Sequence, residues 1–137
     1  MHNQLKTEDH KMPINRIQLK TGSKIEFATL IDKHNKLTLI RKNGLKKTYT
    51  EDDLFLCLAR MRRDFPQSKF LCKGAKLNVY PSRMCSQMSN GAVAYEMVLG
   101  EETTRDHIVH IFDFDDENIA QDIFEQEEFQ RRWMNSF

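Results

Sequence analysis

Hydrophobic and polar positions alternate along the chain from residue 14 to residue 49. The positions that carry this alternation are Ile17, Leu19, Ile25, Phe27, Thr29, Ile31, Leu37 and Leu39. Because successive side chains of a strand point to opposite faces, a period of two predicts strands with one buried face. We therefore expect strands over residues 14–20, 25–31, 37–39 and 45–49.

Polar turns separate these strands at Thr21-Gly22-Ser23, Lys33-His34-Asn35 and Asn43-Gly44. Asn43-Gly44 gives the strongest hairpin signal, because both residues tolerate the positive φ that a two-residue type I′ turn requires. Residues 14–49 therefore predict an antiparallel meander of four strands.

A helical period follows the meander. Hydrophobic residues recur at spacings of four, three and four, at Leu54, Leu58, Met61 and Phe65. This stripe predicts one helix with one face packed on the sheet. We expect Thr50 to cap its first turn, with Asp53 completing a variant capping box, and Pro66 to end it.

Shorter elements are predicted in the rest of the chain. We expect strands at residues 70–72, 76–80, 92–99 and 107–112, and a short helix from Pro81 that places Met84 and Met88 on one face.

Residues 116–137 are predicted to be helical. Their hydrophobic positions fall out of phase between Ile123 and Phe129, which indicates a bend near Glu125-Gln126 or two short helices.

These elements predict an α+β fold: an antiparallel sheet built from the N-terminal meander plus later strands, packed with a central helix and a C-terminal helical segment. One domain is expected over residues 14–137, and residues 1–13 are expected to form a flexible polar leader. No stretch approaches the roughly 18 apolar residues of a membrane helix. The leader lacks the apolar centre of a secretory signal, so we expect a cytoplasmic protein without membrane contact.

The charge of the chain is unevenly distributed. Its 21 Lys and Arg and its 20 Asp and Glu give a formal net charge of +1. Residues 1–85, however, hold 18 basic and 8 acidic side chains, whereas residues 86–137 hold 3 basic and 12 acidic ones. A segment of net +10 is thus joined to one of net −9, and the neutral total does not argue against electrostatic recognition.

No constellation of residues predicts catalysis, a metal or a cofactor. Cys57, Cys72 and Cys85 have spacings typical of neither disulfides nor zinc sites, so we expect buried free thiols. His107 and His110 would point to opposite faces of a strand. A nucleophile made of Cys85 and His110 lacks a third group to orient it. The isolated glycines form no phosphate-binding loop, and we predict that the protein is not an enzyme.

Acidic residues near the C-terminus are the candidate partner-binding surface. They are Asp113, Asp115, Asp116, Glu117, Asp122, Glu125, Glu127 and Glu128. Such a surface would steer a basic protein toward it. Two alternatives stay open: the acidic segment docks on the basic meander of its own chain, or on that of a second copy in a homodimer.

The same acidic run could also suggest a magnesium site, because paired carboxylates bind hard cations. A helix N-terminus favours carboxylates too, and the predicted helix gives Asp115, Asp116 and Glu117 a structural reason to be there.

The basic half allows a second interpretation, a nucleic-acid-binding sheet. Arg41, Lys42, Lys46 and Lys47 surround the Asn43-Gly44 turn, and Arg60, Arg62 and Arg63 follow. Nucleic-acid binding would require these cations on one face together with exposed aromatics, and Tyr49 is the aromatic nearest to them in the last strand of the meander. Lysines that keep a sheet edge solvated explain the same pattern, so nucleic acid is not the partner we expect.

Several short segments carry a resemblance to known proteins. They are Leu71-Cys72-Lys73-Gly74-Ala75, Val79-Tyr80-Pro81-Ser82-Arg83-Met84, Gln87-Met88-Ser89-Asn90-Gly91, Ala94-Tyr95, Ile111-Phe112-Asp113 and Trp133-Met134-Asn135-Ser136-Phe137. Together they resemble a family of small bacterial proteins encoded beside polymorphic-toxin loci of the recombination-hotspot (Rhs) type. The resemblance implies an immunity protein that binds and neutralises a cognate toxin domain without catalysis. Arg83 departs from the glycine of the family pattern, and no catalytic residue is carried over.

Overall fold

The computed structural model describes residues 14–137, and the predicted leader lies outside the described residues. Its larger sheet is antiparallel, with the strand order β4-β3-β2-β1-β5. The strands are β1 (Ile14–Thr21), β2 (Lys24–Lys33), β3 (Lys36–Ile40), β4 (Lys46–Thr50) and β5 (Ser68–Phe70). The predicted meander is therefore confirmed, and β5 extends it by pairing with β1.

The second half of the chain adds a smaller sheet with the order β6-β7-β8. Its strands are β6 (Val79–Tyr80), β7 (Val93–Glu96) and β8 (Ile108–His110). The α-helices are α2 (Leu54–Asp64), α3 (Arg83–Ser89) and α4 (Ile123–Met134), and two short 3-10 turns are η1 (Lys73–Ala75) and η2 (Arg105–His107). None of the helices within residues 14–137 is long and apolar enough to cross a membrane.

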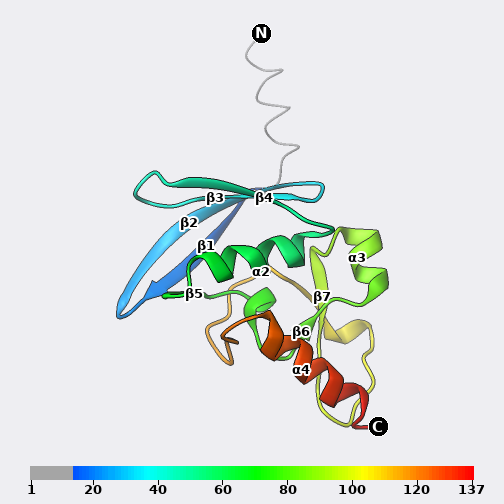
Figure 1. Ribbon diagram of the computed structural model, residues 1–137. Coiled ribbons are helices and arrows are strands. Elements are labelled where there is room, and N and C mark those ends of the chain that lie inside the picture. The colour runs from blue at the N-terminus through cyan, green and yellow to red at the C-terminus, as the bar shows by residue number, and fades with distance from the viewer. Residues whose placement is uncertain (1–13) are drawn as a thin grey trace.

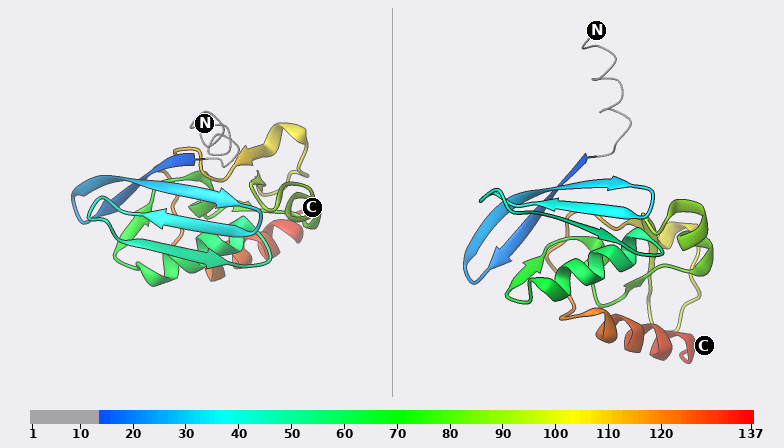
Figure 2. Two further views of the ribbon diagram at one scale, coloured as in Figure 1. Left: turned by 90° about the horizontal axis from the view of Figure 1, so that it is seen from above. Right: turned by 45° about the horizontal axis from the view of Figure 1, so that its top comes forward.

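The elements form layers around α2. Figure 1 shows α2 beneath the curled meander, with α4 on its other side next to β6. Seen from above, the strands of the meander lie over α2 (Figure 2). The predicted α+β fold, with its central helix and its C-terminal helix, is confirmed.

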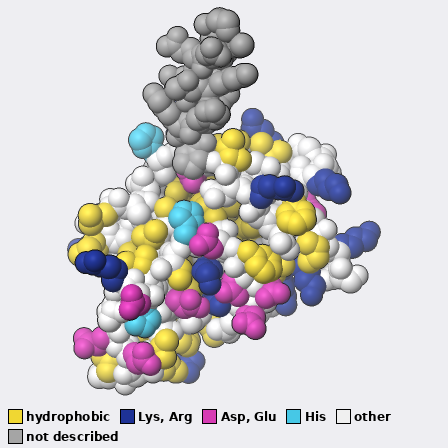
Figure 3. Space-filling view, turned by 180° about the vertical axis from the view of Figure 1, so that it is seen from behind, with side chains coloured by type: hydrophobic (Ala, Val, Ile, Leu, Met, Phe, Trp, Pro, Cys, Tyr) yellow, Lys and Arg dark blue, Asp and Glu magenta, His cyan; other side chains and the backbone are white. Residues whose placement is uncertain are grey.

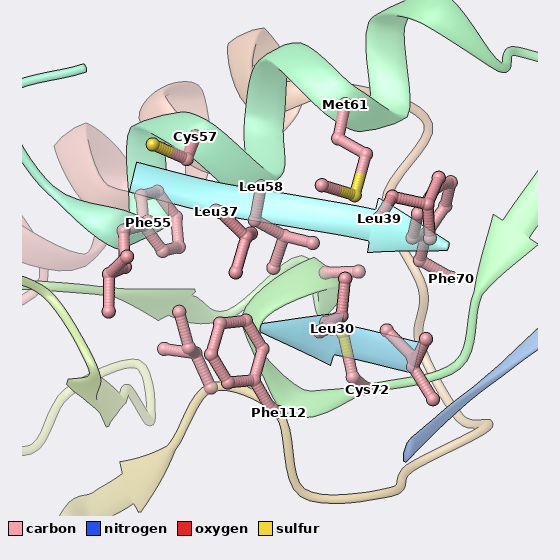
Figure 4. Close-up of a cluster of buried hydrophobic side chains, with 14 of the residues drawn as sticks. Leu30, Leu37, Leu39, Phe55, Cys57, Leu58, Met61, Phe70, Cys72 and Phe112 are labelled. Carbon is pink, nitrogen blue, oxygen red and sulfur yellow. The ribbon is translucent and has the colours of Figure 1, made fainter. Parts of the chain in front are cut away.

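The core lies between the meander and α2. Leu37 and Leu39 of β3 face Leu58 and Met61 of α2, and Phe70 closes the cluster at β5 (Figure 4). All five are almost completely buried. Burial of an aliphatic or aromatic side chain stabilises a fold by about 1.5–3 kcal/mol, so this seam accounts for much of the stability of the N-terminal half.

The buried face of β2 is the opposite of the predicted one. Ala28 and Leu30 are buried, whereas Ile25 and Phe27 are exposed. The strand has hydrophobic residues at both its odd-numbered and its even-numbered positions, so its own pattern does not decide which of the two sets faces inward. Pairing decides it, because Leu30 lies opposite Leu39 of β3 and completes the layer against α2.

The Asn43-Gly44 hairpin is confirmed, but its turn is not the two-residue type I′. The Arg41 N–H donates to the Leu45 carbonyl at 2.8 Å, and the Gly44 N–H donates to the Arg41 carbonyl at 2.9 Å. Of Asn43 and Gly44, only Gly44 has a positive φ, of 93°. This is a three-residue loop with a glycine bulge.

The start of α2 also differs from the prediction. Asp53, not Thr50, is the N-cap, and its carboxylate accepts the Leu56 N–H at 2.8 Å. Thr50 still belongs to β4. The predicted end is confirmed, because α2 stops at Asp64, just before Pro66.

The C-terminal helix begins later than predicted and has no break. Asp122 caps α4, which runs continuously from Ile123 to Met134, so neither a bend nor two helices forms. The phase gap in the hydrophobic pattern is filled by Gln126, a polar residue that is completely buried. Asp115, Asp116 and Glu117 lie well before the helix, so its dipole does not explain them.

The remaining elements are shorter than predicted. The strand expected at 70–72 lies at 68–70, and those expected at 76–80, 92–99 and 107–112 shrink to β6, β7 and β8. Helix α3 forms, but Met84 and Met88 are exposed and do not pack. The three cysteines are free and buried, as predicted.

Candidate partner-binding surfaces

The eight acidic candidates fall into two groups. Asp113, Asp115, Asp116 and Glu117 lie between β8 and α4, on a segment that we call the acidic loop (residues 113–117). The other four lie at the N-cap and in the first turns of α4. Acidic side chains gather over the lower half of the face in Figure 3, whereas Lys and Arg lie mostly on its right.

Asp115 forms ion pairs within the fold and is not available to a partner. Its carboxylate lies 2.7 Å from the Lys76 Nζ and 3.0 Å from the Lys73 Nζ. Lys76 is itself nearly buried and also pairs with Glu96 at 3.1 Å. Burial raises the pKa of Asp115, but hydrogen bonds from Lys76, Lys73 and the Glu117 N–H outweigh it and hold the pKa well below its usual range.

The four carboxylates of α4 are engaged locally. Asp122 accepts the Glu125 N–H at 3.0 Å as the N-cap, and Glu125 in turn accepts the Gln121 N–H at 2.7 Å. Glu127 accepts the Tyr80 hydroxyl at 3.1 Å, and Glu128 pairs with Arg131 on the helix surface. These contacts stabilise the helix and its packing against β6.

Asp113, Asp116 and Glu117 are the exposed acids of the loop, and no ion pair within the described residues involves them. They flank Phe114, whose side chain is 53% exposed. The acidic loop thus holds a half-exposed aromatic ring and three exposed, unpaired carboxylates within five consecutive residues.

Backbone hydrogen bonds fix this loop at several points. The Lys73 N–H donates to the Asp113 carbonyl at 2.8 Å, and the Leu77 N–H donates to the Asn118 carbonyl at 2.8 Å. Phe114 also forms an isolated bridge with Cys72. Because the backbone is tied to η1 and its neighbours, the exposed ring is presented on a rigid support.

The acidic segment does not neutralise the meander. Within residues 14–137, the three ion pairs formed by cations of the meander and of α2 are with acids of that same half: Arg41 with Glu26, Lys47 with Asp64 and Arg60 with Glu51, each at 2.6 Å. The acidic loop and the sheet together line a groove of about 420 Å³, whose lining includes Phe114, Asp116, Lys20, Ile25 and Lys69.

A second surface is the side of the meander that faces away from α2, which we call the outer sheet face. Its residues alternate with the buried ones: Ile14, Arg16, Gln18 and Lys20 on β1, Ile25, Phe27, Thr29 and Ile31 on β2, Lys36, Thr38 and Ile40 on β3, and Lys46 and Thr48 on β4. This set includes no Asp or Glu. Phe27 is 51% exposed, and the Arg16 guanidinium lies 4.8 Å from the centre of its ring.

The basic residues singled out in the sequence do not converge on that face. Tyr49 is buried toward α2, and its hydroxyl donates to Asp64 at 2.8 Å. Burial raises the pKa of Tyr49, and the hydrogen bond to Asp64 adds to the effect. Arg62 lies in the interior on α2. Phe27 was missed as an exposed aromatic because its alternating pattern placed it in the core.

The histidines and cysteines form no reactive group within the described part of the chain, and no cluster of three metal-binding side chains occurs there. His107 Nδ1 accepts the Thr104 N–H at 2.9 Å, and His110 Nδ1 accepts the Phe112 N–H at 3.3 Å. Burial raises the pKa of Cys57 to about 11 and that of Cys72 to about 12, so both remain thiols at neutral pH.

No protein-family model matches this chain, and a comparison with curated proteins also finds no match.

Proposed function

We propose that this chain is an immunity protein that binds a cognate toxin domain, of the Rhs or contact-dependent type, in the cytoplasm. It acts by occlusion, without catalysis. The observation that carries the proposal is the acidic loop, whose five residues hold the half-exposed Phe114 and the exposed, unpaired carboxylates of Asp113, Asp116 and Glu117.

The acidic loop has the composition of a protein-binding surface. Binding energy concentrates in a few buried anchors, often aromatic, while the polar rim excludes water and selects the partner. Three unpaired carboxylates in the same loop favour a basic partner and raise its association rate at low salt. Nuclease toxin domains are often basic, which suits this surface.

The test is co-expression with the toxin domain encoded beside this gene, followed by measurement of binding. We expect the wild-type chain to bind the toxin and restore growth. A triple variant, Asp113→Asn with Asp116→Asn and Glu117→Gln, should slow association about tenfold at low salt. A control that neutralises Glu101, Glu102 and Asp106, three exposed acids outside the loop, changes the net charge equally and should slow it less.

The proposal fails if the toxin domain neither binds the chain nor is silenced by it. The acidic loop is ruled out as the binding surface if both triple variants reduce the association rate by the same factor, because net charge alone would then explain the reduction.

A second candidate function is nucleic-acid binding on the outer sheet face. The observation in its favour is the exposed Phe27 with Arg16 against its ring, on strand positions that include no acid. Aromatic side chains on an open sheet stack with bases, and cations track the phosphates. Retention on heparin and salt-sensitive binding of single-stranded DNA, both reduced by Phe27→Ala and by Lys46→Glu, would support it. No retention at low salt would dismiss it.

A further inference from the structure

A cavity of about 420 Å³ lies where the end of α2, β5 and the segment before α4 meet. Arg62, Ser68, Lys69 and Phe70 line it on one side, and Gln121 and Glu125 on the other. It adjoins the groove beside the acidic loop, with which it shares Lys69 and Ile119, but Arg62 lines the cavity and not the groove.

The unusual member of this lining is Arg62. The residue is only 7% exposed, yet its guanidinium contacts neutral acceptors: Nη1 donates to the Gln126 Oε1 at 2.8 Å and Nη2 donates to the Ala120 carbonyl at 3.2 Å. Among residues 14–137, no carboxylate lies within ion-pair distance of it.

A buried guanidinium without an anion is costly, because desolvation penalises its charge. Burial accordingly lowers the pKa of Arg62, and the more distant Asp122 and Glu125 only partly offset it. A guanidinium has five N–H donors, and the two hydrogen bonds to protein acceptors use a minority of them. The remaining donors and the positive charge suit an oxyanion that enters the cavity.

The rest of the lining adds one cation and one anion. Lys69 supplies a flexible ammonium group, while the carboxylate of Glu125 accepts the Gln121 N–H at 2.7 Å and opposes anion binding. The charged residues of the lining, Arg62, Lys69 and Glu125, sum to +1, while Asp122 also acts on Arg62 from outside the lining. Phe70 and Ile119 provide apolar walls beside it.

We propose that this cavity binds a small molecule through an oxyanion group, a phosphate or a carboxylate, which is seated on Arg62 and reached by Lys69. A guanidinium presents paired N–H donors that match either group in charge-assisted hydrogen bonds. Its test does not involve toxin binding, so either proposal can fail without the other.

The test is titration of the full chain with inorganic phosphate at constant ionic strength, followed by calorimetry and by amide chemical shifts. Acetate in a parallel titration separates phosphate from carboxylate recognition. We expect saturable binding with shifts at residues 62–70 and 119–121, and none with chloride.

Two variants should change the affinity in opposite directions, which nonspecific ion binding would not do. Lys69→Gln should weaken binding about two- to fivefold, whereas Glu125→Gln, which keeps an oxygen for the Gln121 N–H, should strengthen it by a similar factor. Lys46→Gln, on β4 at the other edge of the sheet, removes the same charge and should have no effect.

Arg62→Lys is the direct variant and should abolish saturable binding, since the forked donors are lost. If it fails to fold, the Lys69 and Glu125 variants still decide the matter. The proposal is overturned if neither anion binds saturably, or if Lys69→Gln and Lys46→Gln behave alike.

Discussion

Phe27 and Phe114 are almost equally exposed, at 51% and 53%, but the segments that carry them differ in charge. Phe27 lies on the outer sheet face with the Arg16 guanidinium against its ring, whereas Phe114 lies in the acidic loop, in a groove that Asp116 lines together with Lys20 and Lys69. Exposure alone therefore does not identify a partner. The charges around each ring decide whether it suits an anionic or a cationic surface, and a near-neutral chain can display both.

The two surfaces also rest on different kinds of support. The outer sheet face is backed by the apolar seam between β3 and α2. The acidic loop is tied to η1, which in turn is held by the buried amide of Gln126: its Nε2 donates to the carbonyls of Gly74, Lys76 and Val79 at 3.0, 2.8 and 3.3 Å. One surface thus depends on hydrophobic burial and the other on a buried polar network.

The largest effect is expected from Gln126→Leu, which removes that network. It deprives three buried carbonyls and the Arg62 guanidinium of a partner, and should lower the free energy of unfolding by about 3 kcal/mol. Chemical denaturation measures this loss, and amide exchange should rise around the acidic loop more than in the meander.

Gln130→Leu, on the same helix and half-buried, is the matched control and should cost little. Equal losses from the two variants would show that the buried amide is not the support of the loop.

A smaller effect is expected from Asp115→Asn, which weakens the ion pair with Lys76. The pKa of Asp115 is lower in the folded chain than in the unfolded chain. Its contribution to the free energy of unfolding is therefore complete above the unfolded pKa, and it is lost as the pH falls through the folded pKa. We expect a loss of about 1 kcal/mol near neutral pH. The difference between wild type and variant should therefore shrink as the pH is lowered from 4 to 2.

The diagnostic measurement is denaturant unfolding at pH 7, 4 and 2. A constant difference between wild type and Asp115→Asn over this range would mean that the charge of Asp115 contributes nothing.

The smallest effect on stability is expected from Phe27→Ala and Phe114→Ala, because each ring is half-exposed. Each should change the free energy of unfolding by about 0.5 kcal/mol or less. A loss above about 2 kcal/mol in thermal or chemical denaturation would place that ring in the core and remove it as a candidate contact.

The sequence predicts the meander and α2 well, because Ile17, Leu19, Leu37 and Leu39 keep one strict period. It fails on β2, where both parities are hydrophobic and only pairing with Leu39 selects the buried set. It fails again at α4, because a buried glutamine stands at a core position and its partners are backbone carbonyls up to 52 residues away. Neither cause is local, so neither is visible in a short window of sequence.

The candidate surfaces show the same limit. The acidic segment was found from charge counts, but its separation into paired Asp115 and exposed Asp113, Asp116 and Glu117 depends on where Lys73 and Lys76 fold. The exposed Phe114 carried no signal, since a hydrophobic residue between acids is as consistent with burial as with exposure.

The most direct test of the central claim is the affinity of the cognate toxin domain for the matched pair Phe114→Ala and Phe27→Ala, measured by calorimetry at one salt concentration. The account predicts that Phe114→Ala weakens binding by about thirtyfold, as loss of an aromatic anchor does, while Phe27→Ala leaves the affinity unchanged. Loss of binding in Phe27→Ala with full affinity in Phe114→Ala would contradict it.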